Sequence, residues 1–243
     1  MTDSAVAHKR AFETYDLSVE AAESVTPRNK HLRFRLAPGK ELHFKSGQFA
    51  QMFIPLPDGK IRRSSYSIAS SPSRTDAFEL CVTLVDGGKS STYLHNLKPG
   101  DKIQAMAPLG TFHFFDDGRD SVFVATGSGI APFRSMILEQ LEKKTPRTLT
   151  LIFGNRFEED IIYRKDWEAL AAKHPNFKPH FTLSRADWKG MKGYVQDHIE
   201  DSVPDPKSKN FYICGLKNMI DAVEQKLLAL GVPKEQIHFE RFD

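Results

Sequence analysis

The chain has 243 residues, of which 40% are hydrophobic and 27% charged, so it has the composition of a globular protein and the length of one large domain or two ordinary ones. A net charge of +3, carried by scattered basic residues, is too weak to indicate nucleic-acid binding. The two cysteines, Cys81 and Cys214, have no zinc or iron–sulfur spacing, and we expect no metal. No run approaches the ~18 apolar residues of a membrane helix. We therefore expect a cytoplasmic monomer without membrane insertion.

The first half of the chain has the period-two pattern of half-buried strands. After residues 1–13, which indicate a frayed tail or an edge strand, hydrophobic and polar residues alternate in several short runs: 32–36, 78–84 and 103–107, with 48–54 as a further candidate. Turn signals separate the runs, for example Pro57-Asp58-Gly59 and Pro99-Gly100-Asp101. Short strands at this spacing predict a small antiparallel barrel.

The pattern changes near residues 116–118, and we place the domain boundary there, with domains at 1–116 and 117–243. Beyond it, apolar strands at 122–125, 149–153, 177–183, 211–214 and 237–239 alternate with amphipathic helical segments. This βαβ series predicts a doubly wound α/β domain with a mostly parallel sheet and helices on both faces. Ligands of such sheets bind at the carboxyl ends of the strands.

A turn follows the first of these strands. Gly127 and Gly129 permit a sharp turn, and Pro132 is suited to the first turn of a helix, whose free N–H groups can bind a phosphate. The third glycine of the dinucleotide fingerprint is replaced by proline. Read alone, the segment fits a plain βα turn as well as a phosphate site.

Three further stretches combine basic, hydroxyl and aromatic side chains: residues 62–70 at a strand end, 87–94 before a helical segment with Ser or Thr as N-cap, and 184–196 at the ligand edge of the second sheet. Each could be an ordinary surface loop. Cys214 could be no more than a small core residue. Together, however, phosphate-type loops on both domains indicate one extended ligand or two.

From about residue 15 to the C-terminus, the chain resembles the ferredoxin–NADP reductase family of flavoproteins. The motifs that carry the resemblance are Arg63-Ser64-Ser65-Tyr66-Ser67, Gly88-Lys89-Ser90-Ser91, the segment 127–135, Cys214-Gly215 with Met219, and the ending Phe239–Asp243. The arginine stands three residues before the tyrosine, where the family has two, and one residue follows the terminal aromatic. The resemblance implies an FAD-binding barrel followed by an NAD(P)-binding domain.

On the flavin side, the resemblance implies that Tyr66 packs on the isoalloxazine and Ser67 bonds its N5 edge. Ser91 and Thr92 would hold the FAD pyrophosphate together with Arg63, and Phe242 would cover the ring. The flavin-side candidates are completed by Ser65, Val82, Gly88 and Ser90.

On the nucleotide side, Cys214 would lie beside the nicotinamide as a positioning residue, with Ser67 and Glu240 polarising the reacting pair. The loop candidates are Thr126, Gly127, Gly129, Ile130, Ala131, Pro132, Gly215 and Met219. Ser184, Arg185, Lys192, Tyr194 and Gln196 resemble the pattern that surrounds a ribose 2′-phosphate, which indicates NADP(H), with NAD(H) as the alternative.

The resemblance implies transfer of electrons between NADPH and a ferredoxin or flavodoxin through bound FAD. Two alternatives stay open: an NAD(P)H:flavin reductase that takes flavin as a passing substrate, and an electron-transfer subunit that turns over only within a complex.

Overall fold

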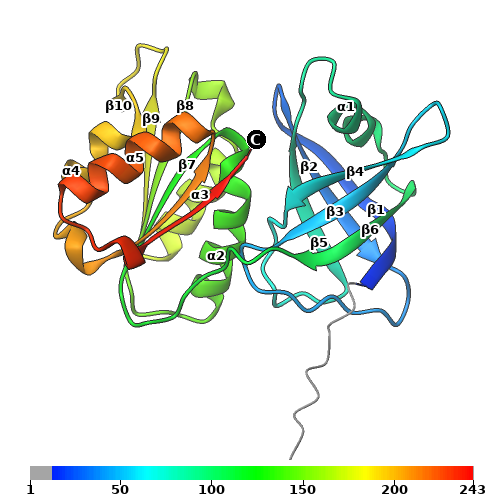
Figure 1. Ribbon diagram of the computed structural model, residues 1–243, viewed down its shortest axis with the longest axis horizontal. Helices are drawn as coiled ribbons and strands as arrows, with labels where there is room; N and C mark the ends of the chain where they lie inside the picture. The colour runs from blue at the N-terminus through cyan, green and yellow to red at the C-terminus, as the bar shows by residue number, and fades with distance from the viewer. Residues whose placement is uncertain (1–12, 243) are drawn as a thin grey trace, which may run out of the picture.

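A computed structural model describes residues 13–242 and shows two halves side by side (Figure 1). Apart from Glu13, the segment expected as a tail or edge strand lies outside the described residues. The first half is built on one antiparallel sheet and the second on one parallel sheet. Within the described residues, no helix is both long and apolar enough to cross a membrane.

The first half is an antiparallel barrel with strand order β4-β3-β6-β1-β2-β5. Its strands are β1 (Glu13–Thr26), β2 (Asn29–Leu36), β3 (Phe49–Pro55), β4 (Ile61–Ser67), β5 (Ala77–Thr83) and β6 (Lys102–Leu109). A bridge between Ile68 and Leu80 joins the two ends of the sheet. The expected period-two alternation is confirmed, because Leu32, Phe34 and Leu36 point into the core while Arg33 and Arg35 point outward.

One strand of the barrel differs from the expectation. Residues 61–67 form a full strand, β4, paired along its length with β3, and are not the loop after a strand that their serines and arginines indicated. Its only hydrophobic residues, Ile61 and Tyr66, do not alternate, so the pairing with β3 decides its conformation. A single helix, α1 (Lys89–Asn96), packs on the barrel through Leu94.

The second half is a doubly wound domain with the all-parallel order β10-β9-β8-β7-β11-β12. The strands are β7 (Ser121–Thr126), β8 (Leu149–Asn155), β9 (Phe177–Leu183), β10 (Met191–Lys192), β11 (Asn210–Gly215) and β12 (Ile237–Arg241). The prediction of this fold is confirmed. The segment 110–120 connects the two sheets, and the boundary at 116/117 within it stays a prediction.

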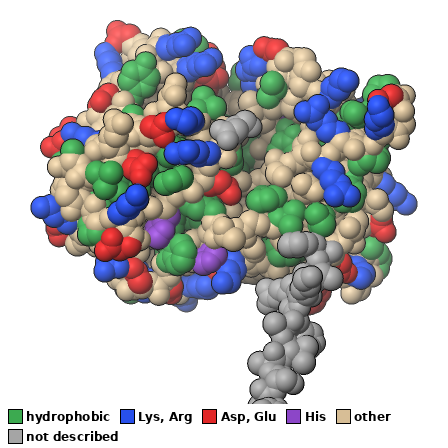
Figure 2. Space-filling view, in the orientation of Figure 1, with side chains coloured by type: hydrophobic (Ala, Val, Ile, Leu, Met, Phe, Trp, Pro, Cys, Tyr) green, Lys and Arg blue, Asp and Glu red, His purple; other side chains and the backbone are tan. Residues whose placement is uncertain are grey.

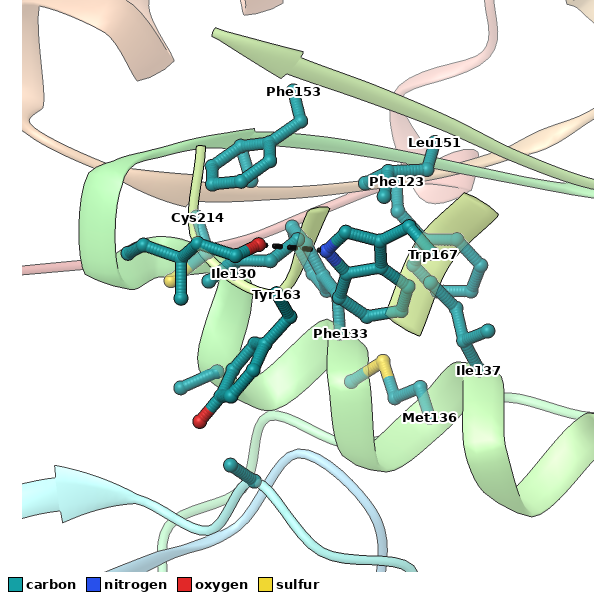
Figure 3. Close-up of a cluster of buried hydrophobic side chains, with 14 of the residues drawn as sticks. Phe123, Ile130, Phe133, Met136, Ile137, Leu151, Phe153, Tyr163, Trp167 and Cys214 are labelled. Atoms are coloured by element: carbon teal, nitrogen blue, oxygen red, sulfur yellow. Dashed lines mark hydrogen bonds between the residues drawn. The ribbon is translucent and has the colours of Figure 1, made fainter. Parts of the chain in front are cut away.

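Helices cover both faces of the parallel sheet, as expected. On one face lie α2 (Ile130–Glu142) and α3 (Arg164–Lys173), around a core that contains Phe133 and Trp167. Figure 3 shows this cluster, in which the Trp167 indole donates to the carbonyl of Ile162. On the other face lie α4 (Ile199–Ser202) and α5 (Lys217–Ala229), which bury a separate apolar cluster.

Helix α2 lies between the sheet and the barrel (Figure 1). The Glu139 carboxylate accepts a hydrogen bond from Ser46 of the barrel at 2.5 Å, and Glu142 accepts one from Ser71. The same helix begins at the glycine turn after β7. The element that carries the predicted phosphate turn is therefore also the element that fastens the two halves together.

Candidate functional site

The glycine turn lies at the point where the strand order of the parallel sheet reverses. From β7 the chain continues outward through β8 and β9, and it returns to the other side of β7 with β11. Doubly wound domains bind their ligands at the carboxyl ends of the strands beside such a reversal. The turn after β7 and the Cys214-Gly215 pair at the end of β11 are therefore neighbours at the expected ligand edge.

Backbone packing holds these two segments together. A Cβ atom on Gly129 would lie 2.7 Å from the carbonyl carbon of Cys214, so only glycine fits there. At Gly215, where φ is +155°, a Cβ would lie 2.7 Å from Thr126 Oγ1 and 2.5 Å from the terminal methyl of Met219. Gly127 has a φ of +53° and open space on its Cβ side. The close packing at Gly129 and Gly215 thus brings the predicted nucleotide-loop residues together, next to the open space beside Gly127.

Helix α2 begins with Ile130, Ala131 and Pro132, all buried, so the proline stands in the first turn as expected. No side chain caps this helix at Gly129. The Ile130 N–H already donates to the Gly127 carbonyl, and Pro132 has no N–H, so among the first three residues of the helix only Ala131 offers an N–H that can donate to a phosphate.

Three predicted catalytic residues meet where the two halves join. The Ser67 hydroxyl, at the end of β4, donates to Glu240 Oε2 of β12 at 3.3 Å. Glu240 is in register with Cys214 on the adjacent strand. The backbone N–H of Phe242 donates to the Gly215 carbonyl at 3.1 Å, which fastens the C-terminal end to the same edge. The sequence-based expectation that Ser67, Cys214 and Glu240 share one site therefore agrees with the geometry.

Burial determines the protonation states of Glu240 and Cys214. Desolvation raises the pKa of Glu240 to about 7, and the Ser67 hydrogen bond opposes that rise only in part. Burial, followed by the nearby Glu240 charge, raises the pKa of the Cys214 thiol well above its usual range. Cys214 is fully buried and its pKa is raised, a setting that favours the unreactive thiol over a nucleophilic thiolate. Glu240 can hold or release a proton near neutral pH.

On the barrel side, the two faces of β4 carry different residues. One face of β4 carries Tyr66, Ser64 and Arg62, which pair with Ala50, Met52 and Ile54 of β3. The three β3 side chains point into the barrel core. The Ser64 hydroxyl is 2.7 Å from the Ser90 hydroxyl at the start of α1. Tyr66 is two-thirds buried; burial raises the pKa of its phenol, and the Arg62 charge opposes the rise. Of the flavin-side candidates, Tyr66 lies on this face and Ser90 contacts it through Ser64.

Arg63 lies on the other face of the same strand. Its guanidinium stands over the Phe53 ring, 5.0 Å from the centroid, and Ser65 shares this outer face. Arg62, which the motif spacing did not indicate, shares the face of Tyr66, whereas Arg63 does not, and Arg63 as the diphosphate ligand stays a prediction. Ser64, which occupies the family's arginine position, was also missed. Strand alternation is the signal that separates these residues, and it requires the register with β3.

The turn before α1 differs in detail from the expectation. Gly88 is the N-cap, not a serine or threonine. The Ser91 hydroxyl is buried and bonds the backbone of Val85 and Gly88, so it shapes the turn. Thr92 is exposed. Val82 has no exposed surface and belongs to the barrel core, so its side chain offers no ligand contact. The free groups at this helix start are the backbone N–H groups, Ser90 and Thr92.

The third predicted cluster lies at the ends of β8 and β9. The backbone N–H groups of Ser184 and Arg185 donate to the carbonyls of Asn155 and Arg156 at 3.0 and 3.1 Å. Ser184, Arg185, Lys192 and Tyr194 are all exposed, and Gln196 is half-buried. Lys192 forms an ion pair with Asp187. Arg156, exposed beside Arg185, is a further candidate for anion binding that the sequence did not single out.

The side chains at this edge fit a polar ligand. Among the residues described, the buried Asn155 Nδ2 donates to no group, and no carboxylate pairs with Arg156 or Arg185. On the barrel side, the Ser64–Ser90 hydroxyl pair and the guanidinium of Arg62 fit a diphosphate, and Tyr66 offers an aromatic face. The space-filling view shows a notch between the two halves above their junction (Figure 2).

The chain matches two domain families. The oxidoreductase FAD-binding domain matches residues 16–114, and the oxidoreductase NAD-binding domain matches residues 123–225. Ferredoxin--NADP reductase B of Sorangium cellulosum is 40% identical over 95% of this chain and 98% of its own length. The reductase component DmpP of a Pseudomonas phenol 2-monooxygenase is 35% identical, and this chain spans 66% of it.

Solved structures agree with these matches. A ferredoxin NADP+ reductase from Neisseria gonorrhoeae, with bound FAD and NADP, has a TM-score of 0.82 and 27% identity, with 95% of this chain and 99% of that chain covered. The flavohem-like FAD/NAD binding domain of a Vibrio cholerae nitric oxide dioxygenase has a TM-score of 0.87, with 94% of this chain and 98% of that chain covered. At 22% identity, the second likeness shows the fold alone.

Replacing Arg62 should weaken FAD binding more than replacing Arg63. We expect Arg62→Ala to raise the FAD dissociation constant about ten-fold or more, because a charged hydrogen bond contributes about 1.5–3 kcal/mol. Arg63→Ala, on the outer face, is the matched control and should change it less than about three-fold. Titrating apoprotein with FAD by fluorescence quenching measures both constants. The reverse order would contradict the assignment of the two strand faces.

Replacing Glu240 should change how stability depends on pH. The folded protein holds the Glu240 proton to about pH 7, whereas the unfolded chain loses it near the ordinary glutamate pKa of 4.5. The free energy of unfolding of the wild type should therefore fall, relative to Glu240→Gln, as the pH rises across this window, by about 1–2 kcal/mol after allowance for partial exposure.

Urea unfolding of FAD-saturated protein at several pH values measures this difference. Glu235→Gln, an exposed carboxylate in the turn before the same strand, should track the wild type throughout. A constant difference between wild type and Glu240→Gln from pH 4.5 to 7.5 would show that Glu240 titrates normally.

Proposed function

The chain belongs to the ferredoxin–NADP reductase family of FAD-dependent oxidoreductases, and on this basis we propose that it exchanges electrons between NADPH and a separate ferredoxin or flavodoxin. The observation that carries the proposal is the meeting of Ser67 from the barrel with Glu240 and Cys214 from the parallel sheet. The FAD-binding and nucleotide-binding halves contribute to one site. Transfer between two flat cofactors needs such a junction, because the reacting atoms must be held about 3–3.5 Å apart.

FAD, when bound, supplies the hydride acceptor and the capacity to release electrons one at a time. The chain contributes placement. Tyr66 provides a flat aromatic face on the barrel, and the Ser67 hydroxyl stands at the junction, where it can orient a flavin edge. The Ser64–Ser90 pair and Arg62 hold the diphosphate.

On the other side, the backbone of Gly127–Gly129 would meet the pyridine nucleotide, and the buried Cys214 would limit the depth to which its ring enters. Desolvation raises the pKa of Glu240 to about 7, so this carboxyl group can hold or release a proton near neutral pH, at the oxygen that accepts from Ser67.

The preference for NADPH rests on the cluster at the ends of β8 and β9. Arg185 and Arg156 are exposed side by side on hydrogen-bonded backbone, and no carboxylate among the described residues pairs with either. Two guanidinium groups without a carboxylate partner fit the dianionic 2′-phosphate of NADPH. NADH has no phosphate at this position for them to bind.

The identity of the acceptor rests on what the chain contains and on its relatives. Its two cysteines are both buried, so they cannot bind an iron–sulfur cluster. We therefore propose that the electrons leave to a separate carrier protein. The Sorangium relative is named for ferredoxin. The Ser64–Ser90 pair and Arg62 support tight FAD binding, which distinguishes this proposal from a flavin reductase that releases its flavin.

Replacing Arg185 should separate the two nucleotides. We expect Arg185→Ala to weaken NADPH binding about ten-fold or more and to leave NADH nearly unchanged, because only NADPH carries the phosphate that the guanidinium contacts. Lys189→Ala, an exposed cation four residues along the same loop, is the matched control. Steady-state kinetics with both nucleotides measures the effect, and equal losses for NADPH and NADH would refute the 2′-phosphate assignment.

The acceptor is tested by assaying cytochrome c reduction with NADPH, with and without added ferredoxins and flavodoxins. We expect a carrier to raise the rate in a saturable manner. A rate independent of every carrier, or a protein that loses its FAD on gel filtration, would favour the flavin reductase instead. Activity of the isolated chain with an artificial acceptor would count against an obligate subunit of a complex.

A further inference from the structure

Four polar side chains form a closed ring between the barrel and the parallel-sheet domain. Arg134 of α2 donates to Glu79 Oε2 of β5 at 2.7 Å, and the Tyr163 hydroxyl lies 2.8 Å from His31 Nδ1 of β2. His31 Nε2 is 3.7 Å from Glu79 Oε1, and the Arg134 guanidinium stands 4.7 Å from the centre of the Tyr163 ring. Each domain contributes two of the four residues.

The ring is buried. His31, Glu79 and Tyr163 are each exposed by 9% or less, and the Arg134 side chain by 15%. Figure 3 shows Tyr163 at the margin of the α2–α3 cluster with its hydroxyl directed out of it. Burial would raise the pKa of Glu79, but the His31 contact and the Arg134 charge hold it well below its usual range. Glu79 is therefore an anion, further paired with Arg33 at 2.7 Å. Charged groups that are this strongly buried stay ionised in a folded protein only when oppositely charged or hydrogen-bonding groups lie close to them.

The ring lies on a short path between the two sides of the site. Arg134 also donates to the carbonyl of Ala69 at 2.8 Å, and the Ala69 N–H donates to the Glu79 carbonyl at 2.8 Å. Ala69 is two residues after Ser67 on the flavin side. Arg134 is four residues after Ile130, where α2 begins at the nucleotide loop. One guanidinium thus joins the end of the flavin-side strand to the helix that carries the nucleotide loop.

We propose that Arg134, held by Glu79 and Tyr163, is a positioning residue that sets the distance between the flavin-side strand end and the nucleotide loop. This inference rests on the proposed function of the site. Arg134 would contact neither the flavin nor the nicotinamide. It acts through its bond to Ala69 and through its place on α2. An error of about 1 Å in such a distance can cost about 100-fold in rate, whereas the nucleotide's own contacts at Arg185 lie elsewhere and stay intact.

Arg134→Met tests the proposal, since it keeps the length of the side chain and removes the donors, while Glu79 retains Arg33 and His31. The first measurement is anaerobic stopped-flow reduction of bound FAD by saturating NADPH, with the charge-transfer absorbance recorded in parallel. We expect the rate to fall about ten-fold or more and the absorbance to weaken, with the NADPH dissociation constant changed less than about three-fold. Arg134→Lys, which can restore one of the two bonds, should recover most of the rate.

The second measurement needs no turnover. Hydrogen exchange of the amides of residues 127–133 should quicken about ten-fold in Arg134→Met, because the helix start loses its link to the barrel. Arg74→Met is the matched control: it removes an arginine that pairs with two carboxylates on the barrel surface, and it should change neither readout.

Two results would overturn the proposal: an FAD-loaded Arg134→Met protein with wild-type rate and exchange, or a lower rate explained wholly by weaker NADPH binding. If Arg134→Met does not fold, Glu79→Gln decides instead, because it weakens the bond that holds Arg134, and unchanged charge-transfer absorbance in that variant would overturn the proposal. A wild-type protein that neither nucleotide reduces would contradict the proposed function, while the exchange measurement would still test the link.

Discussion

The packing of helix α2 against two partners is the constraint on which the site depends. Its apolar side, including Phe133 and Met136, belongs to the core of the parallel-sheet domain. Its polar side chains bond the barrel through Arg134, Glu139 and Glu142. Its first residues follow the glycine turn that rests on the Cys214 carbonyl. One helix therefore fixes the nucleotide loop relative to the sheet below it and to the barrel beside it.

The chemistry of the junction follows from desolvation at that contact. A carboxyl group in water would be ionised at neutral pH, but Glu240 lies between two domains and its pKa rises to about 7. The same burial keeps Cys214 protonated and inert. The arginines proposed to bind ligands, Arg62, Arg156 and Arg185, remain exposed. The buried centre of the site, with Glu240 and Cys214, is thus distinct from its exposed edges, where arginines can bind phosphates.

Much of this architecture could be predicted from the sequence. Alternating apolar residues revealed most barrel strands, and the βαβ series revealed the parallel sheet, because both patterns are local. Strand β4 was missed as a strand because its side chains are nearly all polar, and only pairing with β3 makes it one. The sequence likewise could not show that Arg62 and Arg63 lie on opposite faces of β4, since which face a residue occupies depends on register.

The contacts between the two domains could not be predicted from the sequence. His31 and Tyr163 are separated by 132 positions, and Arg134 and Glu79 by 55, so no spacing links them. Arg134 was noted only as part of the nucleotide-loop motif, and nothing in that motif indicates a bond to the barrel. The meeting of Ser67 with Glu240 was expected only through the family resemblance, because nothing local relates positions 173 residues apart.

The central claim is that bound FAD takes hydride directly from NADPH at the junction of the two domains. The most direct measurement is single-turnover reduction of the FAD-loaded protein by NADPH that carries deuterium at the transferred C4 position. We expect the FAD absorbance to bleach at a rate that saturates with NADPH and that slows with the deuterated nucleotide. Bound FAD that stays oxidised at saturating NADPH, or bleaching that deuterium does not slow, would contradict the account.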